Sequence, residues 1–166
     1  WGNENVAIIH DYWWNTRNTK SYIFNPSDNS MAPVLISDRN YQDNYNDPGN
    51  FVTERNDYGS NVLSIRNNKA FLIGDGYSDK GQFPFVDQIN LNTQNKKRIY
   101  QSNYTDKVED IRNFDPKNNE LLVRIESPTA YPNYYFKNTS KRKLSQITYF
   151  ENPFKSIQNV HKEVIK

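Results

Sequence analysis

The sequence lacks cysteine altogether and has only two histidines among its 166 residues. The absence of cysteine excludes a disulfide framework, a thiolate zinc site and a cysteine nucleophile, and it fits a reducing or an oxidising compartment equally well. The histidines, His10 and His161, match neither H-E-x-x-H nor any closely paired spacing. We therefore expect neither a metal nor another cofactor.

Long apolar runs and dense charge are missing as well. No run approaches the roughly 20 apolar residues that cross a bilayer, so we expect no membrane span. The net charge is only +2, and the basic residues are scattered or form short clusters at 96–98 and 141–143. Nucleic-acid binding would require a concentrated basic face, so we expect no nucleic-acid partner.

Aromatic residues, by contrast, are abundant: twelve Tyr, nine Phe and three Trp make up 14% of a chain that is only 35% hydrophobic. Disordered chains are poor in aromatics, so a folded domain is indicated. Short β-rich runs bounded by Asn, Asp, Gly, Pro or Ser predict about a dozen strands and an all-β fold. These runs are 6–10, 21–25, 32–37, 61–65, 70–74, 85–91, 97–101, 108–112, 120–125, 133–137 and 144–150.

One pattern recurs three times along the chain: a strand, an Asn-containing polar turn and another strand. The three copies of the pattern are SYIFNPSDNSMAPVLIS, VDQINLNTQNKKRIYQS and NYYFKNTSKRKLSQITY, and each copy closes one repeated unit. Asn25, Asn92 and Asn138 lie in their turns. The grouping predicts a partial β-propeller of about three antiparallel four-stranded blades, roughly 1–37, 51–101 and 108–150, the first incomplete. A β-sandwich is the alternative, because its hairpins also recur at short intervals. Propellers close with about four to eight blades, so we expect a piece of a larger protein.

Residues with catalytic potential do not form a recognisable site. No G-x-S-x-G nucleophile elbow is present. The glycine-rich stretch 74–81 fits a long hairpin connection better than a phosphate or calcium loop. Glu109 and Asp110 are adjacent, so on a strand they point to opposite faces and cannot act as a carboxylate pair. We expect His10 to end a strand and His161 to be an exposed linker residue.

The most unusual segment is DYWWNTRNTK, residues 11–20. Tyr12, Trp13, Trp14 and Arg17 are our candidates for substrate contact, because aromatic rings beside cations can stack on sugars or peptides. In the alternative interpretation this segment is a hairpin whose aromatics pack between neighbouring sheets, with Arg17 stacked on a ring. Packing is the stronger of the two interpretations.

Several phrases in order give the chain a family likeness: WWNTRNTKSYIFNP, FLIGDGYSDKGQFPFVDQINLNTQNKKRIYQS, RIESPTAYPNYYF, LSQITYFENPF and VHKEVIK. Together they resemble the β-propeller portion of prolyl oligopeptidase-family serine peptidases. The likeness is greatest to the branch with the glutamyl endopeptidases of plant plastids and bacterial dipeptidyl aminopeptidase-like relatives. It covers nearly the whole chain, and its most specific part is the progression from ESPT through PNYYF to ENPF.

The resemblance implies a propeller over residues 1–158 and, at 159–166, a linker and the start of an absent α/β-hydrolase domain. No residue of that family's Ser-Asp-His triad maps onto this chain, so the chain itself is expected to be non-catalytic. Its implied role is to gate peptide access to the hydrolase domain. The implied partners are that domain, the remaining blades and, for the parent protein, a peptide substrate; a periplasmic or secreted location is slightly favoured.

Two other functions stay open at this stage. One is an all-β module that binds carbohydrate or protein and has no enzymatic partner domain. The other is a propeller scaffold for protein interactions, again without a hydrolase. If the chain is a fragment, its open blade edges expose unpaired strands, and the isolated piece is expected to be marginally stable or to self-associate.

Overall fold

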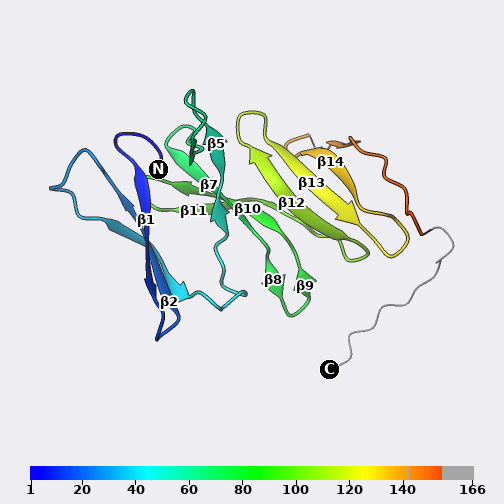
Figure 1. Ribbon diagram of the computed structural model, residues 1–166, viewed down its shortest axis with the longest axis horizontal. Helices are drawn as coiled ribbons and strands as arrows, with labels where there is room; N and C mark the ends of the chain where they lie inside the picture. Colours follow the sequence, from blue (N-terminus) through cyan, green and yellow to red (C-terminus); the bar gives the residue numbers. More distant parts are fainter. Residues whose placement is uncertain (142, 155–166) are drawn as a thin grey trace. The chain divides into compact units, whose positions relative to one another are not determined.

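The structure is a computed structural model that describes residues 1–141 and 143–154. In these ranges all regular secondary structure is β-strand, which confirms the predicted all-β class (Figure 1). The predicted segment 159–166, with His161, lies outside the described residues. The strands are β1 (Ala7–Trp13), β2 (Asn18–Phe24), β3 (Val34–Asn40), β4 (Asn50–Phe51), β5 (Thr53–Arg55), β6 (Asn61–Leu63), β7 (Lys69–Gly74), β8 (Tyr77–Ser78), β9 (Gly81–Gln82), β10 (Phe85–Asn90), β11 (Lys96–Gln101), β12 (Val108–Asp115), β13 (Glu120–Glu126), β14 (Asn133–Asn138) and β15 (Lys143–Gln146).

The chain divides into two compact units, Trp1–Gln101 and Ser102–Lys166. The first contains a three-stranded sheet, β1-β2-β3, and a four-stranded sheet in the order β11-β10-β7-β4. Every pairing in both sheets is antiparallel. The Asn25 turn joins β2 to β3, and the Asn92 turn joins β10 to β11, as the repeated pattern predicts.

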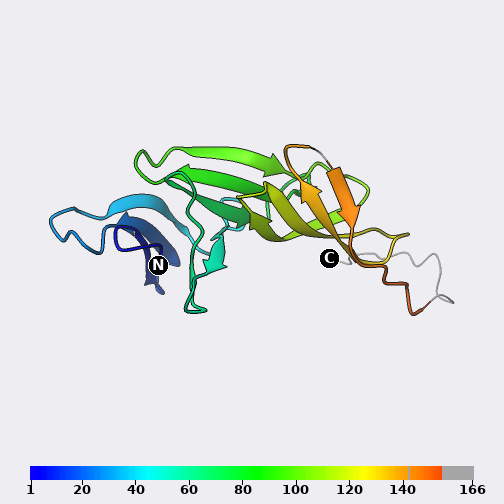
Figure 2. The same ribbon diagram turned by 90° about the horizontal axis from the view of Figure 1, so that it is seen from above.

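The described part of the second unit contains one four-stranded antiparallel meander, β12-β13-β14-β15, visible from above in Figure 2. In β13 the side chains alternate between buried and half-buried positions along the strand. This period of two places Leu121, Val123 and Ile125 on one face. Sheets of consecutive antiparallel strands are the building units of propeller blades, so the predicted partial-propeller architecture agrees with the arrangement seen.

The second predicted blade differs from the structure at its first strand. The run 61–65 was expected to open the four-stranded sheet, but Asn61–Leu63 pairs with Thr53–Arg55 in a separate two-stranded hairpin. The sheet instead begins with the two-residue strand Asn50–Phe51, which pairs with β7. A hairpin inserted between the first and second strands thus carries the apolar run that resembles a sheet strand.

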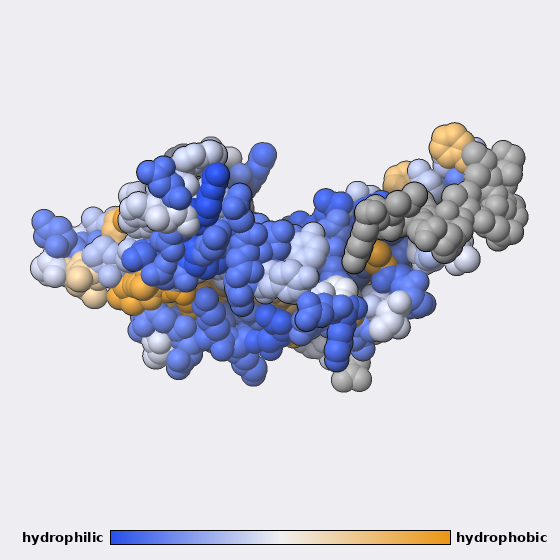
Figure 3. Space-filling model, turned by 90° about the horizontal axis from the view of Figure 1, so that it is seen from below, coloured by the Kyte–Doolittle hydropathy of each residue, from blue (hydrophilic) through white to orange (hydrophobic). Residues whose placement is uncertain are grey.

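The core of the first unit is formed by side chains from both of its sheets. Ile23 of β2 clusters with Ala70, Leu72, Ile89 and Leu91 from the region of β7 and β10. Partly buried side chains extend this cluster: Val6, Ile8, Ile36, Phe51 and Ile65. The three-stranded and four-stranded sheets therefore pack on each other mainly through aliphatic residues. The surface seen in Figure 3 is mainly hydrophilic, with a narrow hydrophobic band.

The glycine-rich stretch 74–81 forms a hairpin connection, as predicted. The strand β8 lies within it and β9 begins at its last residue, and the two strands form the connection between β7 and β10. Gly76 has a positive φ of 66°. A Cβ at Gly76 would lie 1.9 Å from the Phe83 carbonyl oxygen, and the Phe83 amide donates to the Gly76 carbonyl at 2.9 Å. Only glycine fits this close approach of two backbone segments.

Gly76→Ala should therefore lower the free energy of unfolding by about 1–3 kcal/mol. Gly59→Ala is the matched control, because Gly59 also has a positive φ, 77°, but no atom lies within 4 Å of the place that a Cβ would occupy there. Gly59→Ala should lose less free energy of unfolding than Gly76→Ala, since its alanine has the strained backbone conformation but no steric clash with the Phe83 carbonyl. Urea unfolding of both variants measures the difference, and equal losses would contradict the role given to the Phe83 contact.

Candidate functional site

The tip of the β1–β2 hairpin contains all four sequence-predicted contact residues. Trp14 and Arg17 lie in the turn between the strands, and the Arg17 amide donates to the Trp14 carbonyl at 3.3 Å. Arg17 adopts a positive φ of 57°, a conformation that closes tight turns. Its guanidinium carbon consequently lies 4.5 Å from the centre of the Trp14 ring, as the cation–π arrangement requires.

A fourth aromatic side chain, from outside the hairpin, joins this tip. Arg17 Nη1 donates to the Tyr41 hydroxyl at 3.2 Å, and the Tyr41 amide donates to the Arg17 carbonyl at 2.8 Å. The Tyr12 and Tyr41 rings meet edge to face with centroids 6.3 Å apart. We call Tyr12, Trp14, Arg17 and Tyr41 the aromatic cluster. Sequence reasoning did not identify Tyr41, because its approach depends on the pairing of β2 with β3.

Trp13 is separated from this cluster by the pleat of β1, since successive side chains of a strand alternate between faces. On its own face it lines an open hollow together with Thr16, Asn18, Lys20 and Asp38. The Lys20 ammonium lies 5.6 Å from the centre of the Trp13 ring and 3.3 Å from an Asp38 oxygen. The structure thus brings three of the four predicted residues together and places the fourth in a different surface feature.

Asp38 gives the Trp13 hollow a fixed negative charge. The Asn18 side-chain amide donates to Asp38 Oδ1 at 2.8 Å and is the main cause that lowers the pKa of that carboxyl. Burial opposes it with a smaller effect, and Lys20 lowers the pKa further. The carboxylate is therefore ionised at neutral pH. A ring, an amide, an ammonium and a carboxylate surround one hollow, which is suited to binding rather than to bond cleavage.

The aromatic side chains at the hairpin tip are exposed within the described chain. Tyr12 is 67% exposed and Trp14 is 74% exposed. In the described ranges Tyr12 and Trp14 do not pack between the two sheets of their own unit. Arg17 does stack on the Trp14 ring, as the packing interpretation expected. Their exposed faces are available for a ligand or another part of a larger protein.

His10 forms the closest arrangement to a catalytic pair. Its Nδ1 lies 2.8 Å from Ser21 Oγ on the neighbouring strand. A working triad also needs a carboxylate on the other imidazole nitrogen and an oxyanion hole. Among the residues that the structure describes, no carboxylate contacts His10. The expected strand-end position was wrong: β1 continues past His10 to Trp13, with His10 directly opposite Ser21.

Metal-binding and membrane-spanning features are both missing from residues 1–141 and 143–154. These ranges contain no group of three or more metal-ligating side chains. They also contain no helix of the length and apolar character needed to cross a membrane.

The comparisons with known proteins point to peptidases. No family model matches the chain. It is homologous over its whole length to two plant proteins, each named "Probable glutamyl endopeptidase, chloroplastic": it is 32% identical to that of Arabidopsis thaliana and 30% identical to that of Oryza sativa subsp. japonica. The chain spans only 19% of the length of either relative. The predicted likeness to peptidases is thereby confirmed in part, while placement in the prolyl oligopeptidase family, and in any branch of it, stays a prediction.

Among solved structures, TolB from Acinetobacter baumannii aligns with 87% of this chain and 30% of its own chain. The TM-score of that alignment is 0.42 and the sequence identity is 13%.

Proposed function

We propose that this chain is the non-catalytic propeller portion of a serine peptidase of the prolyl oligopeptidase family, in the glutamyl endopeptidase branch. The observation that carries the proposal is the full-length similarity to two much longer proteins named as endopeptidases. The antiparallel meanders of both units support it, because they are the sheets from which propeller blades are built. The catalytic serine would then belong to a hydrolase domain outside these 166 residues.

In this proposal each principal sheet corresponds to one blade. The sheets built from β1–β3, from β4, β7, β10 and β11, and from β12–β15 correspond to the predicted blades 1–37, 51–101 and 108–150. The first sheet has three strands where the other two have four, so its blade would be completed by a strand from the rest of the parent protein. The propeller would restrict the hydrolase site to peptides and exclude folded proteins.

The aromatic cluster is the part of the chain that we propose contacts the peptide. The rings of Tyr12 and Trp14 are exposed, and the Arg17 guanidinium that lies over Trp14 is held by its hydrogen bond to the Tyr41 hydroxyl. The Arg17 side chain is thus pre-positioned, which reduces the entropy lost when a ligand binds. Stacking surfaces of this kind accept peptide side chains without strict sequence demands.

The test uses the parent peptidase. Trp14→Ala should raise KM for peptide substrates by about 2–5-fold with little change in kcat, the loss expected when an exposed stacking contact is removed. Tyr58→Ala is the control, because Tyr58 is 92% exposed on the inserted β5–β6 hairpin and should leave KM unchanged. An unchanged KM in Trp14→Ala would contradict the proposed contact.

A second measurement tests the peptidase itself. A fluorophosphonate probe should label the parent protein on a serine outside this chain and leave the isolated 166-residue chain unlabelled. Labelling of Ser21 would instead make the His10–Ser21 pair a nucleophilic site and overturn the non-catalytic assignment. A parent protein that resists the probe and cleaves no peptide would contradict the peptidase proposal.

The open hollow beside Trp13 favours one alternative function, carbohydrate binding. Sugar-binding surfaces combine an aromatic face with amide and carboxylate hydrogen-bonding groups, and Asn18 and Asp38 supply those groups here. A carbohydrate-binding module would bind oligosaccharides through Trp13 and show no peptidase activity in its parent protein. Oligosaccharide binding lost in Trp13→Ala would support this alternative.

A further inference from the structure

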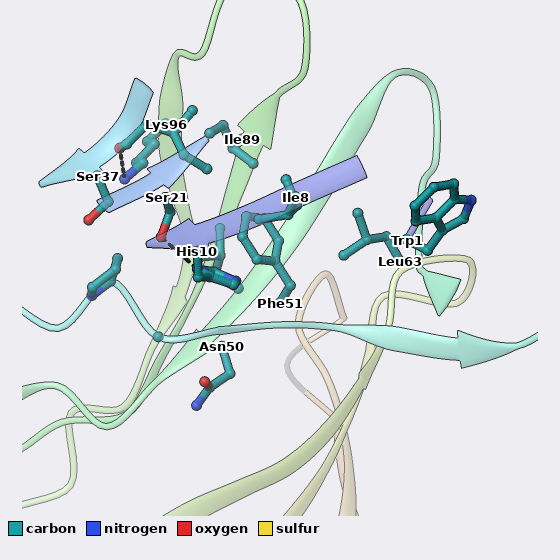
Figure 4. A pocket seen from close by; sticks show the side chains of 14 residues that line it. Trp1, Ile8, His10, Ser21, Ser37, Asn50, Phe51, Leu63, Ile89 and Lys96 are labelled. Carbon is teal, nitrogen blue, oxygen red and sulfur yellow. Dashed lines mark hydrogen bonds between the residues drawn. The ribbon is translucent and has the colours of Figure 1, made fainter. Parts of the chain in front are cut away.

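A cavity of about 370 Å³ lies inside the first unit, between its two sheets (Figure 4). Aliphatic and aromatic side chains form most of its wall: Ile8, Ile36, Phe51, Leu63, Leu72 and Ile89. All of these side chains except Leu63 belong to the core cluster or pack against it, and Leu63 is itself buried, so the wall is positioned by both sheets. The cavity has the size and the largely apolar lining of small-ligand sites in proteins.

Polar groups gather toward one end of this cavity. Figure 4 shows Lys96, Ser37, Ser21 and His10 on one side of the view and Trp1 and Leu63 on the other. His10 Nδ1 and Ser21 Oγ are 2.8 Å apart, which fixes the orientation of the imidazole ring and leaves its Nε2 available to a ligand. His10 is exposed, so this end of the cavity is open to solvent.

Lys96 gives the polar end a positive charge. Its ammonium donates to the Ile36 carbonyl at 3.3 Å, a long hydrogen bond that uses one of three N–H groups. No Asp or Glu lines the cavity, and across the described ranges no carboxylate forms an ion pair with Lys96. An uncompensated cation at the edge of an apolar cavity favours an anionic ligand.

From this arrangement we infer that the cavity binds a small monocarboxylate with an aliphatic tail. The tail would contact the apolar wall formed by the partly buried side chains of Ile8, Ile36 and Phe51. The carboxylate would accept hydrogen bonds from Lys96 Nζ and from His10 Nε2. A second charged group on the tail would be buried without a partner, so dicarboxylates are excluded. The site lies within the first unit and is independent of the proposed peptidase function.

Octanoate is the probe ligand. Octanamide is the control ligand, because it has nearly the same shape but carries no charge. Calorimetric titration of the 166-residue chain should give a dissociation constant for octanoate of roughly 0.1–1 mM, and octanamide should bind at least about tenfold more weakly. Suberate, the eight-carbon dicarboxylate, should not bind. Equal binding of octanoate and octanamide would overturn the inference, because the charge would then play no part.

Lys96→Gln should weaken octanoate binding about tenfold or more while leaving octanamide binding unchanged. Lys97→Gln is the matched control, because Lys97 is the next residue of β11 and does not line the cavity. Equal weakening by both variants would show general attraction to positive charge and would overturn the site. The comparison of the two ligands on the unaltered chain decides the question even if Lys96→Gln does not fold.

Discussion

Replacing Lys137 by methionine is expected to lower the free energy of unfolding of the chain by about 3–5 kcal/mol. Lys137 of β14 donates to Glu109 of β12 at 2.8 Å, and Glu109 is only 2% exposed. Methionine retains much of the side-chain volume but removes the ammonium. The buried Glu109 carboxylate would then lose the positive charge of Lys137, and removing one partner of a buried ion pair is among the most costly single changes in a protein interior.

Urea unfolding followed by circular dichroism measures this loss. The double variant Glu109→Leu with Lys137→Met should recover most of the stability, because replacing both charges by apolar groups removes the buried carboxylate as well. Arg112→Gln is the surface control: Arg112 pairs with Asp110, both partners are substantially exposed, and a loss below about 1 kcal/mol is expected. A Lys137→Met chain within about 1 kcal/mol of the unaltered chain would contradict the importance of the pair.

The ion pair between Glu109 and Lys137 could not be predicted from the sequence. Glu109 and Asp110 were expected on opposite faces, and they are: Glu109 bonds to Lys137, whereas Asp110 bonds to Arg112. Alternation alone does not say which face is buried when both neighbours are acids. The lysine that pairs with Glu109 stands 28 positions later, two strands away in the sheet. Long-range partners of this kind leave no local signal.

Strands whose side chains alternate strongly are predicted well from the sequence, and short or inserted strands are not. The run 120–125 corresponds to β13, where Leu121, Val123 and Ile125 are buried. The two residues of β4 carry too little pattern to be recognised, so the more apolar run 61–65 is favoured as the first strand of its sheet. A period of two needs about four or more residues to be visible.

The candidate site shows the same division between local and long-range information. The hairpin that holds Tyr12, Trp14 and Arg17 was predicted, because its aromatic and turn residues are consecutive. Tyr41 was missed, since only the register of β2 against β3, with Asn18 opposite Asn40, brings its hydroxyl within hydrogen-bond distance of the Arg17 guanidinium. Trp13 was grouped with its neighbours in the sequence although the pleat of β1 separates it from them.

The end of the last sheet was predicted too far along the chain. The run 144–150 was expected to be one strand, but β15 ends at Gln146. Beyond it the Ile147 amide still donates to the Tyr134 carbonyl at 2.9 Å, whereas the Tyr134 amide donates to the Thr148 hydroxyl at 2.8 Å. A side chain thus replaces the backbone carbonyl that would continue the ladder.

Asn133 holds the segment that follows β15. Its Oδ1 accepts from the Thr148 hydroxyl at 2.9 Å and from the Phe150 amide at 2.7 Å. Its Nδ2 donates to the Phe150 carbonyl at 3.1 Å and to the Tyr131 carbonyl at 3.2 Å. Asn133 is buried, and its amide therefore has a partner for both lone pairs and both hydrogens. One side chain takes over the pairing that a neighbouring strand would otherwise provide.

Asn133→Ala should lower the free energy of unfolding by about 2–4 kcal/mol, because it leaves several hydrogen-bonding groups around a buried position without their partner. The same variant should increase amide hydrogen exchange at Phe150, whose N–H bonds to Asn133 Oδ1. Asn133→Asp is the matched variant: it keeps the acceptor for Thr148 and Phe150 but places a carboxylate oxygen against the two carbonyls. It should protect the Phe150 amide while still losing stability. Unchanged exchange at Phe150 in Asn133→Ala would mean that the segment after β15 is held by other contacts.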